Sequence, residues 1–150
     1  MSGPTVREAI SEEVERVLGM YEWLFEPPGY VPPNWDPDRA RDALREAIAS
    51  DDSAVLVAEH RGELLGFATA YLELNSVRFG QRCWIEDLAV NPEHRSEGVG
   101  GALLDAAGDW ARDRGATHLE LDTGLAREDA QRFYDRREPA AKGYSYSWRL

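Results

Sequence analysis

A strand, a glycine turn and a helix follow one another between Cys83 and Ala107, and this order constrains the chain more than any other feature. Residues 83–90 (CWIEDLAV) form an apolar run rich in β-prone residues, which Asn91-Pro92 ends. A glycine-rich turn, Gly98-Val-Gly-Gly101, then opens a helix. The first N–H groups of a helix lack partners within it, and glycine lets a ligand approach the backbone closely. The segment predicts an anion site suited to a pyrophosphate, with Arg95 as an added cation.

Two better-known phosphate-binding motifs do not fit this turn. A P-loop needs Gly-Lys-Ser/Thr at the start of the helix, whereas Gly100 is followed by Gly-Ala. A dinucleotide-binding fingerprint needs a third glycine at the position that Leu103 occupies. What remains is Arg95-x-x-Gly98-x-Gly100 after an apolar strand. At this point two interpretations stay open, a phosphate site and a glycine-rich turn without a ligand.

Length and charge limit the classes of function. A chain of 150 residues suits one domain, residues 1–150, with a core that needs no disulfide or metal. The formal net charge of −11 argues against a nucleic-acid partner and favours a cationic small substrate. The single cysteine, Cys83, is expected to pack in the core. The sequence has no apolar run of membrane-spanning length and residues 1–17 do not resemble a secretory signal, so we expect a cytoplasmic protein without a membrane partner.

Periodicity along the rest of the chain predicts a mixed α/β domain. Strands are expected at Thr5–Glu8, Ala54–Ala58, Leu64–Leu72, Cys83–Val90, His118–Thr123 and Tyr144–Leu150. The last of these strands rests on the alternation of Tyr, Tyr, Trp and Leu with Ser, Ser and Arg. Helices are expected from Glu12 to Phe25 with Ser11 as N-cap, from Pro37 to about Ser50 with Asp36 as N-cap, from Gly98 to Arg114 with Gly115 as C-cap, and from Ala126 to about Arg137.

A second motif, Asp129-Ala-Gln-Arg-Phe-Tyr134, lies in the last predicted helix and is followed by Gly143-Tyr144. It resembles the fourth-helix pattern Asn-x-x-Ala-x-x-Phe-Tyr…Gly-Phe of the GNAT acetyltransferase superfamily. The turn from Arg95 to Gly101 likewise resembles the coenzyme A loop of that family, and the two motifs stand in the family's order. The resemblance implies the GNAT acyl-CoA N-acyltransferase fold, an α/β fold with a central, mostly antiparallel sheet, splayed strands and four flanking helices.

The resemblance also implies a site for acetyl-CoA as cosubstrate. Acetyl-CoA would lie between the strands 83–90 and 118–123, with its pyrophosphate on the glycine turn. The residues implied as its ligands are Leu88, Ala89, Val90, Arg95, Ser96, Gly98, Val99, Gly100, Gly101 and Arg127. Two positions depart from the family pattern: Arg127 replaces the usual asparagine, and Glu97 stands where a basic residue is common. The three histidines are far apart and lack ligand spacing, so no metal is expected.

Transfer of an acetyl group to an amine needs a base for the ammonium proton and an acid for the leaving thiolate. The resemblance places Tyr134 as the acid and an acidic base at the position of Glu86. In a regular strand, side chains of residues 84, 86, 88 and 90 share one face, so Asp87 would point the other way unless a β-bulge intervenes. Glu86 is therefore the first choice for the base and Asp87 the second.

The family's first two helices and their loop usually form the wall of the acceptor site. Here that segment carries Glu22, Glu26 and Trp35, which with Asp87 are the candidate substrate ligands. Acids beside aromatic rings suit a cation, although the same residues also suit a core with solvated acids. The expected function is transfer of acetyl from acetyl-CoA to a small cationic amine such as a polyamine, an amino sugar or an aminoglycoside. The alternatives are acetylation of a protein lysine or N-terminus, and a catalytically silent acyl-CoA-binding module. A homodimer that pairs through the C-terminal strand is also possible.

Overall fold

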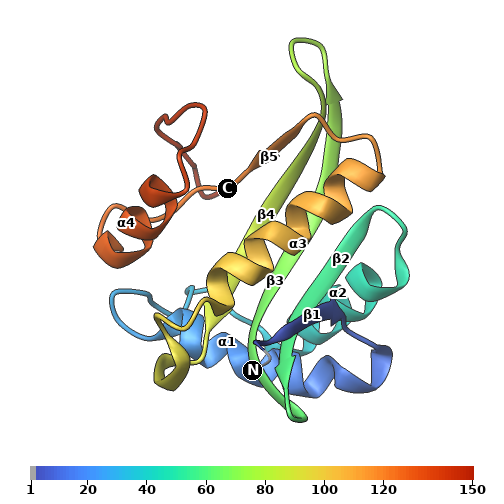
Figure 1. Ribbon diagram of the computed structural model, residues 1–150, viewed down its shortest axis with the longest axis vertical. Helices are drawn as coiled ribbons and strands as arrows, with labels where there is room; N and C mark the ends of the chain where they lie inside the picture. Colours follow the sequence, from blue (N-terminus) through green and yellow to red (C-terminus); the bar gives the residue numbers. More distant parts are fainter. Residues whose placement is uncertain (1–2) are drawn as a thin grey trace.

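A five-stranded sheet forms the centre of the structure, a computed structural model that describes residues 3–150 (Figure 1). Its strands lie in the order β1-β2-β3-β4-β5, in which the first three neighbouring pairs are antiparallel and β4 and β5 are parallel. Their bounds are Thr5–Glu8, Ser53–His60, Glu63–Ser76, Gly80–Val90 and His118–Glu120. The predicted mixed α/β fold with a mostly antiparallel sheet is confirmed.

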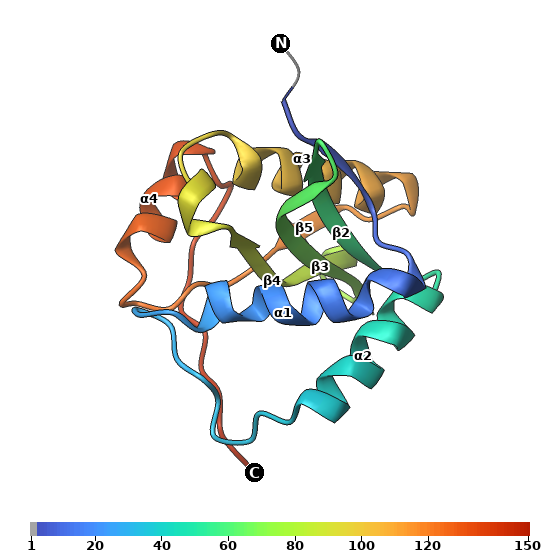
Figure 2. The ribbon, with the colours of Figure 1, turned by 90° about the horizontal axis from the view of Figure 1, so that it is seen from below.

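Helices cover both faces of this sheet (Figure 2). α3 (Val99–Asp113) packs on one face, while α1 (Val14–Phe25) and α2 (Pro37–Ala49) pack on the other. α4 (Glu128–Arg136) stands at the side of the molecule, beyond β5 (Figure 1). None of the helices in residues 3–150 has both the length and the apolar character that crossing a bilayer requires.

The helix ends follow the predicted signals at two of three positions. Asp36 caps α2 as predicted, because its carboxylate accepts the N–H groups of Asp38 and Arg39. Gly115 ends α3 with a φ of 81°, as expected of a C-terminal glycine. The predicted Ser11 cap of α1 is wrong. A 3-10 turn precedes this helix, and the Ile10 N–H donates to the carboxylate of Glu13 (3.0 Å).

β4 and β5 separate after a short paired stretch. They pair only from Arg82–His118 to Trp84–Glu120, where Arg82 also forms an ion pair with Glu120 (Nη2–Oε2 2.6 Å). β5 ends there, three residues earlier than predicted, whereas β4 continues to Val90. The expected pair of splayed strands is therefore present, and β5 forms one edge of the sheet.

A β-bulge on β4 changes which side chains share a face. Thr69 of β3 pairs with Asp87 and Ala70 pairs with Ile85, so Glu86 is an extra residue without a partner on β3. As a result Ile85 and Leu88 both pack in the core on the α3 side, and Ala89 packs on the α1 side. β4 is therefore not regular along 84, 86, 88 and 90: the bulge that the sequence left open is present, and it gives Asp87 the face that Glu86 would occupy in a regular strand.

The predicted closing strand is also wrong. Residues 144–150 form no strand and belong to no pair in the described sheet, although their polar and apolar side chains alternate. The large apolar side chains of this segment remain exposed: Tyr144, Tyr146, Trp148 and Leu150. Alternation alone does not form a strand, because a strand also requires a neighbour for its backbone groups.

The turn after α4 contains a residue in a backbone conformation that its side chain disfavours. Glu138 follows the C-terminal end of α4 with a φ of 55°, a left-handed conformation in which glycine is the usual residue. Gly143, which the resemblance matches to the glycine of the family motif, does not have a positive φ. The structure thus places the glycine-preferring position at Glu138.

We expect Glu138→Gly to raise the free energy of unfolding by about 1 kcal/mol, because glycine adopts this conformation without the steric cost of a Cβ. Urea unfolding followed by circular dichroism measures the change. Glu128→Gly, at the first position of α4, is the matched control and is expected to be neutral or destabilising. An unchanged or lower stability of Glu138→Gly would contradict the assignment of strain to this residue.

Candidate active site

The bulge places the carboxylate of Asp87 beneath α1. The Tyr21 hydroxyl donates to Asp87 Oδ2 (2.7 Å), and the Asp87 backbone N–H donates to Thr69 Oγ1 (3.1 Å). Tyr21 lies on α1 at the spacing of its buried residues, and its ring packs against Phe67 of β3 with centroids 4.8 Å apart. Asp87, on β4, is therefore held by one residue of β3 and one of α1.

The partial burial of Asp87 determines the pH at which its carboxyl group loses its proton. Removal from water raises the pKa of Asp87 to about 6, and the nearby charge of Glu86 adds to the rise, while the Tyr21 hydrogen bond opposes it. Burial also raises the pKa of Tyr21 and Tyr71, with a further contribution from the charge of Asp87, so both phenols stay protonated at neutral pH. A carboxylate with a pKa near 6 is ionised at pH 7 and is still a competent proton acceptor.

Asp87 lines a pocket of about 290 Å³ between α1, α2 and the sheet. The other lining residues are mostly aromatic or small: Tyr21, Trp35, Arg39, Ala40, Ala43, Leu44 and Tyr71. Trp35 stacks on Tyr21 with ring centroids 5.8 Å apart and also meets Phe25 edge-on at 4.8 Å. At the start of α2, Arg39 Nη2 donates to the Asn34 carbonyl (2.8 Å), which orients this guanidinium at the pocket.

The other predicted acids lie outside this pocket. Glu86 is exposed and accepts a hydrogen bond from Trp84 Nε1 (2.8 Å). Glu22 and Glu26 are exposed on α1 and at its end, and Glu26 lies 4.0 Å from Arg95 Nη2. Of the four predicted substrate ligands, the structure therefore brings together Asp87 and Trp35 but leaves Glu22 and Glu26 apart from them.

The turn between β4 and α3 has the open backbone expected of an anion site. A 3-10 turn (Pro92–His94) begins at Asn91, whose side chain accepts the Glu93 N–H (2.9 Å). Ser96 and Gly98 then both have positive φ, 64° and 86°. No side chain caps α3, and its first turn contains no acid, so the N–H groups of residues 99–101 stay available to an anion.

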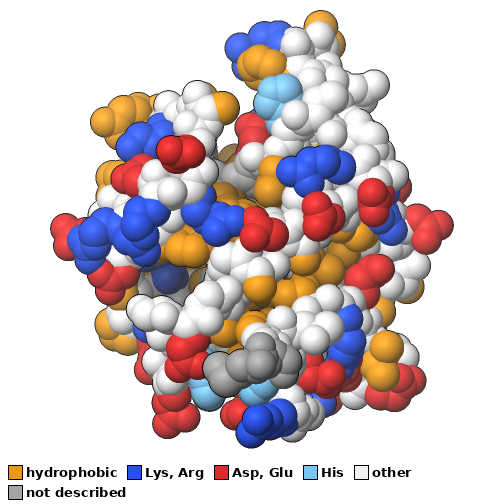
Figure 3. Space-filling view, viewed as in Figure 1, with side chains coloured by type: hydrophobic (Ala, Val, Ile, Leu, Met, Phe, Trp, Pro, Cys, Tyr) orange, Lys and Arg blue, Asp and Glu red, His pale blue; other side chains and the backbone are white. Residues whose placement is uncertain are grey.

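α4 lies close to the start of α3, on the side of the splayed strands. A Cβ on Gly100 would stand 3.5 Å from the Phe133 ring, an ordinary contact distance, so the start of α3 and α4 lie side by side here. Tyr134 is half-buried beside Phe133, with ring centroids 5.1 Å apart, and burial raises the pKa of Tyr134, which keeps the phenol protonated. Arg127 Nη2 donates to the Leu24 carbonyl (2.9 Å) and so joins the start of α4 to the end of α1. Figure 3 shows hydrophobic side chains in the hollow between α4 and the rest of the molecule.

Sequence reasoning missed three residues that build this site, Arg39, Thr69 and Tyr71, and it missed the hydrogen bond from Tyr21 to Asp87. Tyr21 has the helical spacing of a core residue, and this spacing gives no indication that its hydroxyl donates to Asp87. Thr69 and Tyr71 lie in a strand whose pattern predicts only burial. A threonine opposite an Ile-Glu-Asp sequence is consistent with a bulge, but only the pairing register identifies it.

Comparison with known proteins shows the family and the fold of this chain. The sequence profile of the Acetyltransferase (GNAT) family matches residues 17–138. The Uncharacterized N-acetyltransferase YhdJ of Bacillus subtilis is 38% identical over 89 residues, which cover 59% of this chain and 63% of YhdJ, so the match spans less than two thirds of that relative. The Aminoglycoside N(6')-acetyltransferase type 1 of Stenotrophomonas maltophilia is 31% identical over 134 residues, 87% of this chain and 80% of that protein. The structure of aminoglycoside N-acetyltransferase AAC(6')-Iy in complex with CoA shares the fold, with a TM-score of 0.84 at 20% identity over 100% of this chain and 96% of that one. The profile covers most of the chain, which therefore belongs to the GNAT family of acetyltransferases.

Proposed function

We propose that this chain is an acetyl-CoA-dependent N-acetyltransferase that transfers the acetyl group directly to a small primary amine. The observation that carries the proposal is Asp87, a partly buried carboxylate with a pKa near 6 that lines a small pocket beside the splayed end of β4. Family membership supports the use of acetyl-CoA, as does the open first turn of α3. A structural carboxylate would be expected to pair with a cation, whereas Asp87 accepts from a neutral phenol.

The cofactor site that we propose uses backbone groups more than side chains. Residues Leu88 to Val90, at the end of β4, would bind the pantetheine, and the turn from Arg95 to Gly101 would bind the pyrophosphate. Arg127 already donates to Leu24, so we assign it to the wall of the site through its link to α1. Bound acetyl-CoA supplies a thioester that reacts with a neutral amine.

The protein's own groups handle two protons in this proposal. Asp87, ionised above pH 6, accepts the proton that the ammonium form of the substrate must lose. Tyr134, kept neutral by burial, donates a proton to the leaving sulfur as the C–S bond breaks, and the proton that the nitrogen loses as the amide forms restores the phenol. Glu86 remains the alternative base, acting through water from the exposed side of the bulge.

A thiol-release assay with a panel of amines tests the proposal. Acetyl-CoA is supplied with polyamines, amino sugars, aminoglycosides, amino acids, aminoalkylphosphonates and a lysine peptide. Release above the hydrolysis background with a small amine supports the proposal, and release with the peptide alone supports protein acetylation instead. Saturable binding of acetyl-CoA without release for any amine would identify a silent binding module.

Arg39 favours a second acceptor class, amines that also carry an anionic group. It is the only cation among the residues that line the pocket, and it shares the pocket with Asp87. A carboxylate or phosphonate on the substrate would pair with this guanidinium while the amine faces Asp87. One relative, from Salmonella typhimurium, is named an aminoalkylphosphonate N-acetyltransferase, with 30% identity over 107 residues. In the panel, Arg39→Gln would then lower kcat/KM for such amines alone, and Arg45→Gln, on the same helix outside the pocket, is the control.

We expect Tyr134→Phe to lower kcat about 100-fold with little change in acetyl-CoA affinity, because the hydroxyl acts on the leaving sulfur. The ring contact with Phe133 is kept, so the packing of α4 is preserved. Steady-state kinetics and calorimetric titration measure the two effects. Tyr144→Phe, at an exposed position, is the control, and unchanged turnover of Tyr134→Phe would remove the proposed acid.

A further inference from the structure

Three segments that are distant in sequence meet at Gly29, in the loop between α1 and α2 (residues 26–36). A Cβ on Gly29 would clash with the carbonyl oxygens of Leu24 and Glu26, the second at 2.8 Å. It would also stand 2.6 Å from Arg127 Nη2. The loop, the end of α1 and the start of α4 are therefore packed so closely that only glycine fits between them.

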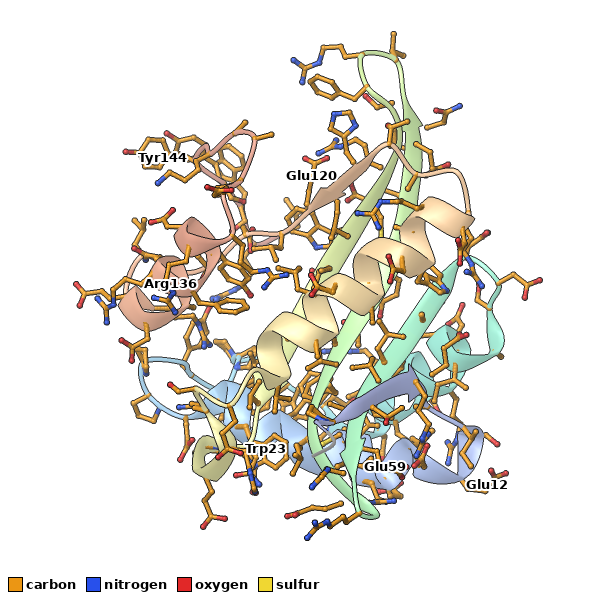
Figure 4. The ribbon with its side chains drawn as sticks, in the orientation of Figure 1. Glu12, Trp23, Glu59, Glu120, Arg136 and Tyr144 are labelled. Atoms are coloured by element: carbon orange, nitrogen blue, oxygen red, sulfur yellow. The ribbon has the colours of Figure 1, made fainter. Side chains whose placement is uncertain are left out.

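Arg127, the residue before α4, holds this junction together. Its Nη2 donates to the Leu24 carbonyl (2.9 Å), and its side chain is half-buried there. In Figure 4 the pale-blue loop after α1 runs beneath α4, the helix that carries the labelled Arg136. The Gly29 N–H donates to the Glu26 carbonyl (2.6 Å), so the first turn of the loop is fixed at the same junction.

The loop connects this junction to the pocket. Four of its eleven residues are proline, whose ring fixes φ and stiffens the chain. In the middle of the loop Tyr30 is 71% and Val31 is 56% exposed, so contacts near its two ends determine its position. Near the second end, Trp35 lines the pocket with Asp87 and stacks on Tyr21. A shift of the first turn would therefore move one wall of the pocket.

We propose that Arg127 is a positioning residue for the amine acceptor, which holds the loop 26–36 against α1 so that Trp35 stays in the wall of the pocket around Asp87. This role rests on the proposed function, in which that pocket receives the amine. It differs from the role that the family resemblance implies for this position, a ligand of acetyl-CoA, because the guanidinium is turned to the backbone of α1. Loss of Arg127 then opens the acceptor side and leaves the affinity for acetyl-CoA nearly unchanged.

The pKa of Asp87 reports the position of the loop without any substrate. Burial raises this pKa from 3.8 to about 6, so water admitted by a displaced loop should lower it. Loss of a cation that acts directly on the carboxylate would raise the pKa instead, so the direction of the shift separates the two effects. The titratable and charged groups around Asp87 remain in every variant below: Tyr21 from α1, Arg39 from α2, Tyr71 from β3 and Glu86 beside it.

Carbon-13 NMR titration of the Asp87 carboxyl group in two variants tests the proposal. Arg127→Ala removes the hydrogen bond at the junction, and Gly29→Ala displaces the loop without any change of charge. Both should lower the pKa of Asp87 by roughly one pH unit. Arg132→Ala, at an exposed position on α4, and Gly19→Ala, whose Cβ would meet nothing within 4 Å, are the matched controls and should leave this pKa unchanged.

Two further measurements locate the effect of Arg127→Ala. The amides of Gly29 and Trp35, which donate within the loop (2.6 and 3.0 Å), should exchange their hydrogens faster. The amide of Val57, in the buried middle of the sheet, should exchange as in the wild type if the fold is intact. In calorimetric titration the affinity for acetyl-CoA should stay within about twofold of the wild type.

A raised or unchanged pKa of Asp87 in Arg127→Ala would overturn the proposal. A loss of acetyl-CoA affinity of about tenfold or more in this variant would also overturn it, because Arg127 would then be a ligand of the cofactor. Neither measurement requires turnover or an amine. Failure of this proposal is therefore distinguishable from failure of the proposed function, which the thiol-release panel tests.

Discussion

Asp87→Asn is expected to lower kcat/KM for the amine by about 100- to 10,000-fold, the range that loss of a general base produces. The asparagine has the size of the aspartate and can still accept the Tyr21 hydroxyl, so the geometry of the pocket is kept. In the wild type, kcat/KM should rise with pH as Asp87 loses its proton near pH 6. This limb of the pH profile should be absent from the variant.

The same substitution should stabilise the protein at neutral pH. The pKa of Asp87 is raised from 3.8 to about 6 in the folded state, so the folded state binds a proton more tightly than the unfolded state does. Between these pH values the wild-type free energy of unfolding falls as pH rises, and above pH 6 a penalty of roughly 2–3 kcal/mol remains. Asp87→Asn removes this penalty, so its advantage in urea unfolding should be full at pH 8 and vanish below pH 4.

Two further variants test whether Asp87 or Glu86 is the base. Asp109→Asn makes the same chemical change at an exposed position on α3 and should alter neither activity nor the pH dependence of stability. Glu86→Gln tests the other candidate base across the bulge. If Glu86→Gln abolishes the rise of kcat/KM near pH 6 and Asp87→Asn leaves this rise in place, Glu86 is the base and Asp87 is not.

Arg95→Gln is expected to weaken acetyl-CoA binding by about 10- to 100-fold, because a charge-assisted hydrogen bond contributes roughly 1.5–3 kcal/mol. Arg95 is half-exposed and only loosely engaged by Glu26 at 4.0 Å, so it is free to turn toward a pyrophosphate. Glu97→Gln, two residues later, should act in the opposite direction and strengthen binding, because it removes a negative charge from the same turn.

Calorimetric titration at two salt concentrations measures both effects. The difference in acetyl-CoA affinity between Arg95→Gln and Glu97→Gln should shrink at high salt, because salt screens these two exposed charges. Arg112 lies on the last turn of α3, and Arg112→Gln is the matched control, for which no change in acetyl-CoA affinity is expected. Equal affinity of Arg95→Gln and wild type would place the phosphates elsewhere.

The parts of the fold that depend on local pattern could be predicted from the sequence. Helices carry capping residues and a helical period, and the Asp36 cap and the Gly115 end were both found by these signals. The closing strand was wrong because residues 144–150 meet the local requirement for a strand without having a neighbour in the chain. Pairing depends on residues distant in sequence, and local alternation does not reveal them.

The candidate site was predictable in its location but less so in its chemistry. The glycine turn and the α4 motif identify the two elements that flank the splayed strands. The relative orientation of Glu86 and Asp87 depends on one extra residue in the pairing of β3 with β4, which the sequence of β4 alone does not specify. Likewise, Arg39 lines the pocket while its guanidinium donates to the Asn34 carbonyl in the loop before α2, a contact that local sequence pattern does not reveal.

The bulge at Glu86 has a further consequence for how such a site can arise. A bulge bends and twists its strand, and here the pairing of β4 with β5 stops two residues before it. The same extra residue therefore accompanies both the separation of β4 from β5 and the position of Asp87 beneath α1. In genetic terms, the insertion of one codon into a regular strand would supply the proposed cofactor opening and the proposed base together.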